Sequence, residues 1–251
     1  MILCIMTDPS RTAAELFDED MAAAYDRRNS GLKPISDCLH FLMDLTLADL
    51  PSPARVLCIG VGTGAEIFAL AEKHPGWSFV GVDPSAAMLE AGRRRLEAAG
   101  LLDRCRLIQG YVEDVADCEF DAAVALLVAH FIKLPERPAF YRAVCQRLRP
   151  GGRFLSAEIA GDLDGPEFPA MLQDWKQVQA RMGATEASLA SLPDLLRNVL
   201  GVVPPVQTER LWREAGFAPP APFFQAFMIR GWHARKLENA HFSPAGPRLS
   251  D

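Results

Sequence analysis

The sequence predicts an α/β protein built on a doubly wound, mostly parallel sheet with helices on both faces. Three observations support this fold class. Apolar runs typical of buried strands alternate with helical segments between residues 54 and 161. These strands are apolar along their whole length, as expected when helices cover both faces of a sheet. A glycine-rich stretch, VLCIGVGTGAE at residues 56–66, joins the first strand to its helix.

The predicted elements follow one another in a regular order. The strand ARVLCIG leads to the helix TGAEIFALAEKH, and the strand WSFVGVD leads to the helix PSAAMLEAGRRRLEAAG. The strands RCRLIQG and FDAAVALLVA precede the helix PERPAFYRAVCQRLR, which we expect to stop at Pro150. RFLSAEI is a fifth strand. After the helix TERLWREAG, the stretch FFQAFMIRGWHAR completes a Rossmann-like sheet that we expect to have seven strands.

Two segments lie outside this alternation. Residues 1–53 are predicted to form an N-terminal helical lid, with an amphipathic helix over residues 34–50. Residues 162–203 are predicted to form a helical cap inserted after the fifth strand, over the carboxyl end of the sheet, where open α/β folds bind ligands. The core then covers residues 54–161, residues 204–236 complete the sheet, and residues 237–251 form a tail.

Composition narrows the class of protein. The 251 residues are 49% hydrophobic and 23% charged, and the net charge of −6 argues against a broad nucleic-acid surface. Six dispersed cysteines without a C-x-x-C pair predict neither a metal site nor a disulfide framework. No apolar run reaches the roughly 18 residues of a membrane span. We therefore expect a cytoplasmic protein, with a homodimer left open, and the predicted cap favours a small-molecule substrate.

The glycine-rich turn is compatible with two cofactors. Gly60, Gly62 and Ala65 fit the dinucleotide pattern G-x-G-x-x-[GA]. Gly60, Gly62 and Gly64 equally fit G-x-G-x-G, which is associated with S-adenosylmethionine sites. Asp83 ends the second strand, where its carboxylate can accept hydrogen bonds from both ribose hydroxyls of either cofactor, or can cap the helix that follows Pro84.

Residues further along distinguish the two cofactors. LIQGYVEDV, FDAAVALLVAHFI and YRAVCQRLRPGGRFL occur in that order, and over residues 55–160 the chain resembles the class I S-adenosylmethionine-dependent methyltransferases. In that family the helix before strand five ends Leu-x-Pro-Gly-Gly. The resemblance implies S-adenosylmethionine as cofactor, S-adenosylhomocysteine as product, and transfer of a methyl group to a small-molecule acceptor by in-line displacement.

The resemblance also implies a set of cofactor contacts. The three glycines would line the methionine and ribose portions, and Asp83 would bind the ribose hydroxyls. Two positions depart from the family: Cys58 stands where many members carry an acid that helps to hold the ligand's ammonium, and Tyr111 stands where many carry Asp. The other implied contacts are with adenine (Met88, Tyr111, Val112, Glu113) and with the methionine portion (Leu126).

Four further side chains are candidates for the site. Tyr25 and Arg28 lie in the predicted lid, where Arg28 would pair with the methionine carboxylate or remain a solvated arginine. His130 follows the fourth strand and is a candidate general base, or else orients a loop or packs beside Phe131. Glu158, near the end of the fifth strand, would hold substrate or cap the next helix.

A second, looser resemblance concerns the outer segments. FDEDMAAAYD, LQDWKQV and FQAFMIRGWHARK are similar to the carboxy-S-adenosylmethionine synthase branch of the family. In that branch an arginine of the cap holds the extra carboxylate; here Pro193 takes its place, and Arg197 lies one turn away. An enzyme that uses a modified cofactor, and a non-catalytic nucleotide-binding or regulatory protein, therefore remain as alternatives.

Overall fold

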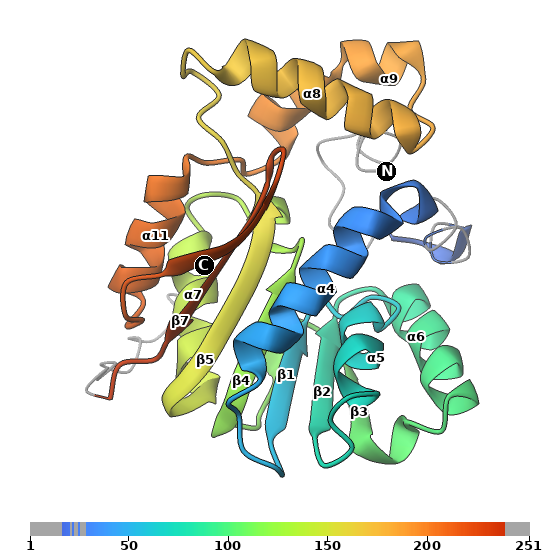
Figure 1. Cartoon of the computed structure of the whole chain (residues 1–251), viewed down its shortest axis with the longest axis vertical. Coiled ribbons are helices and arrows are strands. Elements are labelled where there is room, and N and C mark those ends of the chain that lie inside the picture. The colour runs from blue at the N-terminus through green and yellow to red at the C-terminus, as the bar shows by residue number, and fades with distance from the viewer. Residues whose placement is uncertain (1–16, 21, 23–24, 26–28, 239–251) are drawn as a thin grey trace, which may run out of the picture.

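A computed structural model of the chain describes residues 17–20, 22, 25 and 29–238 (Figure 1). Its centre is one seven-stranded sheet with the order β3-β2-β1-β4-β5-β7-β6. Strands β1 to β5 are parallel, and β7 is antiparallel to both of its neighbours, β5 and β6. The predicted fold class is therefore confirmed. The strands are β1 Arg55–Ile59, β2 Ser78–Asp83, β3 Cys105–Gln109, β4 Phe120–Leu126, β5 Leu148–Ile159, β6 Ala221–Ala226 and β7 Ile229–Arg235.

Helices cover both faces of the sheet (Figure 1). On one face lie α4 (Lys33–Leu47), α5 (Ala65–Ala71) and α6 (Ala86–Ala98), which share one apolar core with β1 and β2. On the other face α7 (Arg137–Arg147) and α11 (Pro205–Glu214) pack around Trp212 and Phe154. Burial of apolar area in these two cores is the main force that holds the layers together. Short helical turns are η1 Ser30–Leu32, η2 Leu102–Arg104, η3 Val112–Asp114 and η4 Ala129–Phe131.

The segment between β5 and α11 lies outside these three layers. It contains α8 (Phe168–Arg181), α9 (Glu186–Ala190), α10 (Leu192–Asp194) and a π-helical turn, η5 (Leu195–Val199). Figure 1 shows α8 and α9 beyond the end of the sheet from which β5 leads into this segment. A third apolar core, which includes Trp175, joins the segment to Leu39 of α4 and to Ile159 and Ile229 of the sheet.

Three local details differ from the sequence-based predictions. Helix α5 begins at Ala65 and not near Thr63, because Gly64 takes a left-handed conformation as its N-cap. The run LRPGG does not simply end a helix, because β5 already begins at Leu148 and shifts its register against β4 near Phe120. In α4, Leu45 shares the apolar helical spacing of Ile35, Leu39 and Leu42, from which the amphipathic helix was predicted, yet it is 54% exposed.

A buried ion pair and its hydrogen bonds join α7 and α11 to the sheet. Arg137 of α7 and Glu158 of β5 are both fully buried, with Nη1 and Oε2 2.8 Å apart. The hydroxyl of Thr208 in α11 donates to Glu158 over 2.7 Å, and the Arg137 guanidinium donates to the carbonyl oxygen of Gly201. The sequence had suggested that Glu158 holds substrate or caps a helix. This prediction is wrong, because Arg137 and Thr208 occupy its carboxylate.

Among the described residues, no helix has the combination of length and hydropathy that crossing a membrane requires. The same residues contain no group of three His, Cys, Asp or Glu side chains arranged to hold a metal ion.

Candidate functional site

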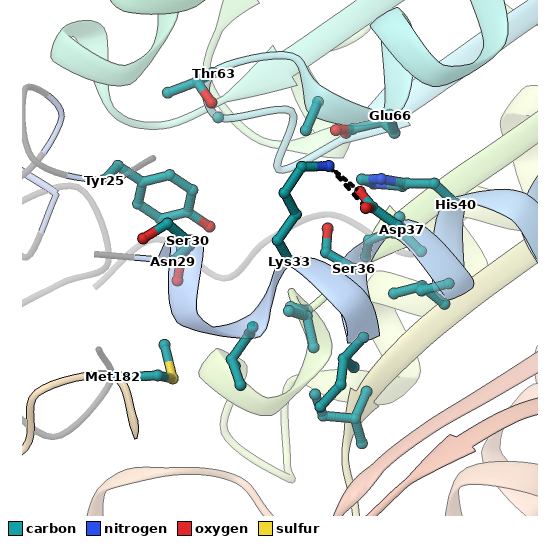
Figure 2. A pocket seen from close by; sticks show the side chains of 18 of the residues that line it. Tyr25, Asn29, Ser30, Lys33, Ser36, Asp37, His40, Thr63, Glu66 and Met182 are labelled. Atoms are coloured by element: carbon teal, nitrogen blue, oxygen red, sulfur yellow. Dashed lines mark hydrogen bonds and ion pairs between the residues drawn. The ribbon is translucent and has the colours of Figure 1, made fainter. Parts of the chain in front are cut away.

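A cavity of about 440 Å³ opens where the carboxyl ends of β1, β4 and β5 meet helices α4 and α8. One side of it is apolar and includes Leu126, Ile159 and Trp175. Figure 2 shows much of the opposite, polar side, with Tyr25, Asn29, Ser30, Lys33, Ser36, Asp37, His40, Thr63 and Glu66. The cavity lies at the switch point of the strand order, between β1 and β4, where open α/β sheets bind ligands.

The glycine-rich turn forms part of the cavity wall. Gly60 and Gly62 line the cavity with φ values of +63° and +51°, in the left-handed region that glycine adopts without strain. A Cβ atom at Gly60 would lie 2.4 Å from Cγ2 of Val128. Glycine is therefore required at Gly60 both by conformation and by space. Gly64, the third glycine, caps α5 and is not among the residues that line the cavity.

Asp83, at the end of β2, holds this turn in shape. One carboxylate oxygen accepts from the N–H of Gly62 and the other from the N–H of Ser85, both over 2.9 Å. Burial raises the pKa of Asp83, and the two backbone hydrogen bonds oppose that rise. Ser85, not Asp83, is the N-cap of α6, because its hydroxyl accepts from the N–H of Met88. Each Asp83 oxygen retains acceptor capacity for a further donor.

The residues predicted to contact adenine are not among those that line the cavity. Met88 is buried, and its Cε lies 3.1 Å from the position that a Cβ on Gly62 would take. Val112 is buried in η3, and Glu113 beside it accepts from Arg147 through its carbonyl oxygen over 2.7 Å. Tyr111 is 54% exposed. Met88 therefore lies against the turn, whereas Tyr111, Val112 and Glu113 follow β3, the strand beside β2.

The predicted lid residues are described only in part. Tyr25 lines the cavity, and its ring packs edge-on against Phe17 with the ring centroids 6.1 Å apart. Arg28 lies outside the described residues.

His130 lies beneath the site and not in its wall. It is fully buried, its Nδ1 accepts from the N–H of Ile159 over 3.3 Å, and its ring packs 4.5 Å from that of Phe131. Burial, reinforced by the charge of Arg137, lowers the pKa of His130 to about 3. A neutral imidazole that is held in this way, and that is not among the residues lining the cavity, favours the structural alternative over a role as general base.

Helix α4 supplies polar side chains that the sequence analysis did not single out. Lys33, Ser36, Asp37 and His40 all line the cavity, at the i, i+3, i+4 and i+7 positions of one helical face. Both carboxylate oxygens of Asp37 accept from Nζ of Lys33 over 2.7 Å. Burial lowers the pKa of His40, and Asp37 opposes that shift. In the sequence, the helical spacing of these four polar residues could have indicated that they share one face of α4.

Glu66, in the first turn of α5, is a further cavity residue that was not predicted from the sequence. It lines the cavity while only 6% exposed, and Cys58 of β1 is among its neighbours. Burial raises the pKa of Glu66 to about 8, and the negative charge of Asp83 adds to the rise. In the part of the chain that the structure describes, no lysine or arginine lies within ion-pair distance of its carboxylate. In the sequence, Glu66 could have been noticed as the single acid in an otherwise apolar helical stretch, EIFALA.

The arginine near the expected carboxylate-binding position has another partner. Arg197 donates to Asp164 over 2.7 Å and stacks on the ring of Phe168 with its guanidinium carbon 5.2 Å from the centroid. It is not among the residues that line the cavity, and Pro193 lies in α10. Within the described residues, the helical segment after β5 therefore presents no arginine to the cavity.

The strand order and the glycine-rich turn that Asp83 braces define a Rossmann-like domain. Residues 56–152 match the family model described as a methyltransferase domain. Curated relatives include carboxy-S-adenosyl-L-methionine synthases of Campylobacter curvus, 25% identical over 85% of this chain and 90% of the relative, and of Wolinella succinogenes, 27% identical over 88% and 93%. The matched domain and these relatives support the resemblance of the chain to the class I S-adenosylmethionine-dependent methyltransferases.

Solved structures agree on the fold. An O-methyltransferase family protein from Burkholderia thailandensis superposes with a TM-score of 0.68 at 14% identity, over 94% of this chain and 67% of that one. PigF, solved with S-adenosylhomocysteine, gives a TM-score of 0.66 at 19% identity, over 93% of this chain and 64% of that one. At these identities the likeness concerns the fold alone.

Proposed function

We propose that the protein transfers a methyl group from S-adenosylmethionine to a small-molecule acceptor held in the cavity. The observation that carries the proposal is the cavity itself, which extends from the glycine-rich turn, inside the segment that matches a methyltransferase domain, to α8. Its volume of about 440 Å³ lies within the range of small-molecule sites.

The residues present fit the donor. Gly60 and Gly62 line the cavity without side chains, which allows close approach of a ligand, and the acceptor capacity of Asp83 suits two ribose hydroxyls. Met88, Tyr111, Val112 and Glu113 would border the adenine, while Leu126 and Tyr25 would contact the methionine portion. When bound, S-adenosylmethionine supplies an electrophilic methyl group and leaves as S-adenosylhomocysteine.

The chain's own contribution to the transfer is alignment and exclusion of water. We assign the N-terminal segment to a lid and residues 162–203 to a cap, since α4 and α8 form opposite walls of the cavity. Walls on both sides hold the acceptor in one orientation and reduce its contact with solvent. The apolar wall around Trp175 suits the body of an organic acceptor, and the polar face of α4 suits its hydrogen-bonding groups.

A carboxylated cofactor is the second candidate. The observation that favours it is the similarity to carboxy-S-adenosyl-L-methionine synthases along nearly the whole chain. The engagement of Arg197 with Asp164 speaks against it. Mass spectrometry of ligand retained through purification separates the two candidates, because the carboxylated cofactor is heavier than S-adenosylmethionine by the mass of CO2.

Asp83→Ala tests the donor assignment. We expect at least tenfold weaker binding of S-adenosylhomocysteine, because the variant loses both the ribose acceptor and the brace on Gly62. Calorimetric titration measures the affinity, and Asp103→Ala, which removes an exposed acid, is the matched control. Equal affinity of the Asp83 variant and the wild type would contradict the assignment. Stabilisation of the wild type by NAD alone, in a thermal shift that includes both adenosyl ligands, would contradict the proposed function.

A further inference from the structure

Glu66 is a buried acid in a ligand cavity, and it has no cationic partner among the described residues. An unpaired carboxylate in this position costs free energy, since charged groups withdrawn from water are destabilised unless an opposite charge lies nearby. The protein meets this cost by keeping Glu66 protonated near neutral pH, as its pKa of about 8 indicates. The site is therefore suited to a ligand that brings its own positive charge.

The other ionisable groups around the cavity are less suited than Glu66 to pair with a positively charged ligand. Helix α4 presents Lys33, Asp37 and His40 to the same cavity, and Lys33 is already bound by both oxygens of Asp37 (Figure 2). Cys58 of β1 supplies no negative charge, because burial raises the pKa of its thiol well above the ordinary value. Asp83, the last residue of β2, acts on Glu66 by its negative charge but is engaged with the turn. Arg95 of α6 lines the same cavity and donates to Thr63.

We propose that Glu66 binds the α-ammonium group of the donor's amino-acid portion, and that donor binding is coupled to loss of the proton from Glu66. The inference rests on the proposed function, since S-adenosylmethionine and S-adenosylhomocysteine carry that ammonium. Both Glu66 and the turn residues Gly60 and Gly62 line one cavity, so a donor held against the turn can place its charged end beside this carboxyl. The oxygen–hydrogen bond of Glu66 breaks, its proton passes to solvent, and the carboxylate pairs with the ammonium.

Calorimetric titration of the full chain tests the proposal with two probes. One is S-adenosylhomocysteine, and the other is its analogue that lacks only the α-amino group. We expect Glu66→Gln to weaken binding of S-adenosylhomocysteine at least tenfold and to leave binding of the deamino analogue unchanged. Glu72→Gln, which alters an exposed acid at the end of the same helix, is the matched control and should bind both probes as the wild type does.

Proton release provides a readout that needs no variant. Titrations at pH 7 in buffers of different ionisation enthalpy should show release of about one proton when the wild type binds S-adenosylhomocysteine, and far less when it binds the deamino analogue. This measurement keeps the proposal falsifiable if Glu66→Gln does not fold.

The outcomes separate the two levels of inference. A wild type that binds S-adenosylhomocysteine without releasing a proton, or a Glu66→Gln variant that binds it with unchanged affinity, overturns the role of Glu66 and leaves the methyltransferase proposal standing. Equal weakening for both probes also overturns it, since that pattern indicates a structural role. A wild type that binds neither adenosyl probe overturns the proposed function itself.

Discussion

At the scale of single residues, loss of hydration sets the charge near the site. His130 and Glu66 are both buried, and burial moves their pKa values in opposite directions, to about 3 and about 8. Both side chains are therefore neutral at pH 7 in the ligand-free protein. In this state His130 serves as a hydrogen-bond acceptor for Ile159, while Glu66 holds a proton that a cationic ligand can displace.

His130→Leu should lower the free energy of unfolding and make it less dependent on pH in the acid range. The folded pKa of His130 is lowered, so the unfolded chain takes up a proton first, and stability is lost as pH falls from 6.5 towards 3. The variant lacks this loss, which reaches about 1.4 kcal/mol per pH unit. At pH 7.5 it should be less stable by about 1–3 kcal/mol, because the N–H of Ile159 loses its acceptor.

Urea unfolding of wild type and variant at several pH values measures both effects. Parallel pH profiles for the two proteins would show that His130 does not stay neutral in the folded state. Turnover provides a second readout once an acceptor is known: a structural His130 leaves the pH dependence of turnover in the variant unchanged, whereas a general base does not.

At the scale of an element, the β1–α5 turn depends on its first glycine. Gly60→Ala combines strain at a φ of +63° with a contact of 2.4 Å between the new Cβ and Val128. Gly100→Ala is the matched control, because Gly100 has a φ of +67° and nothing within 4 Å of the new atom. The control should lose about 1–2 kcal/mol of stability from strain alone.

Gly60→Ala should be less stable than this control and should also lose affinity for S-adenosylhomocysteine, since the turn must shift to make room for the methyl group. Thermal unfolding and calorimetric titration of the two variants test this expectation. Equal stability of the two variants would mean that Val128 yields without cost, and the space argument for Gly60 would then be incorrect.

At the scale of the whole molecule, the Arg137–Glu158 pair joins separate layers. It connects α7 to β5, and further hydrogen bonds extend to α11 and to Gly201, where the chain leaves the helices over the cavity. Arg137→Met should cost about 3–5 kcal/mol, because Glu158 remains buried without its partner. Burial already raises the pKa of Glu158, and Arg137 opposes that rise.

Denaturant unfolding measures the loss, with Arg213→Met as control for an exposed pair. Arg213 lies 3.3 Å from Glu209 and is 49% exposed, so its removal should change stability by less than about 1 kcal/mol. Adding Glu158→Gln to Arg137→Met should recover part of the loss, since no buried charge remains. Similar losses for Arg137→Met and Arg213→Met would contradict the role given to the buried pair.

Much of the core was predictable because its signals are local. Apolar runs, proline and glycine positions and the glycine-rich turn specify strands and helices over a few residues, so the order of the elements, the mostly parallel sheet and the place of Asp83 followed from the sequence. The placement of Glu158 and the inward face of α4 did not follow. Glu158 ends a strand as a ligand-binding acid would, yet its partner Arg137 comes from α7, 21 positions earlier in the chain.

By itself the sequence determined the class of fold, the glycine-rich turn, and the family resemblance that the comparisons support. Only the tertiary structure decided which polar side chains share the cavity and which ionisable groups are withdrawn from water. Glu66 and the polar face of α4 meet because α4 packs against α5 on one face of the sheet, an arrangement that no local pattern encodes. Burial depends on all neighbours of a residue at once, and for this reason the protonation of His130 and Glu66 was decided by the fold.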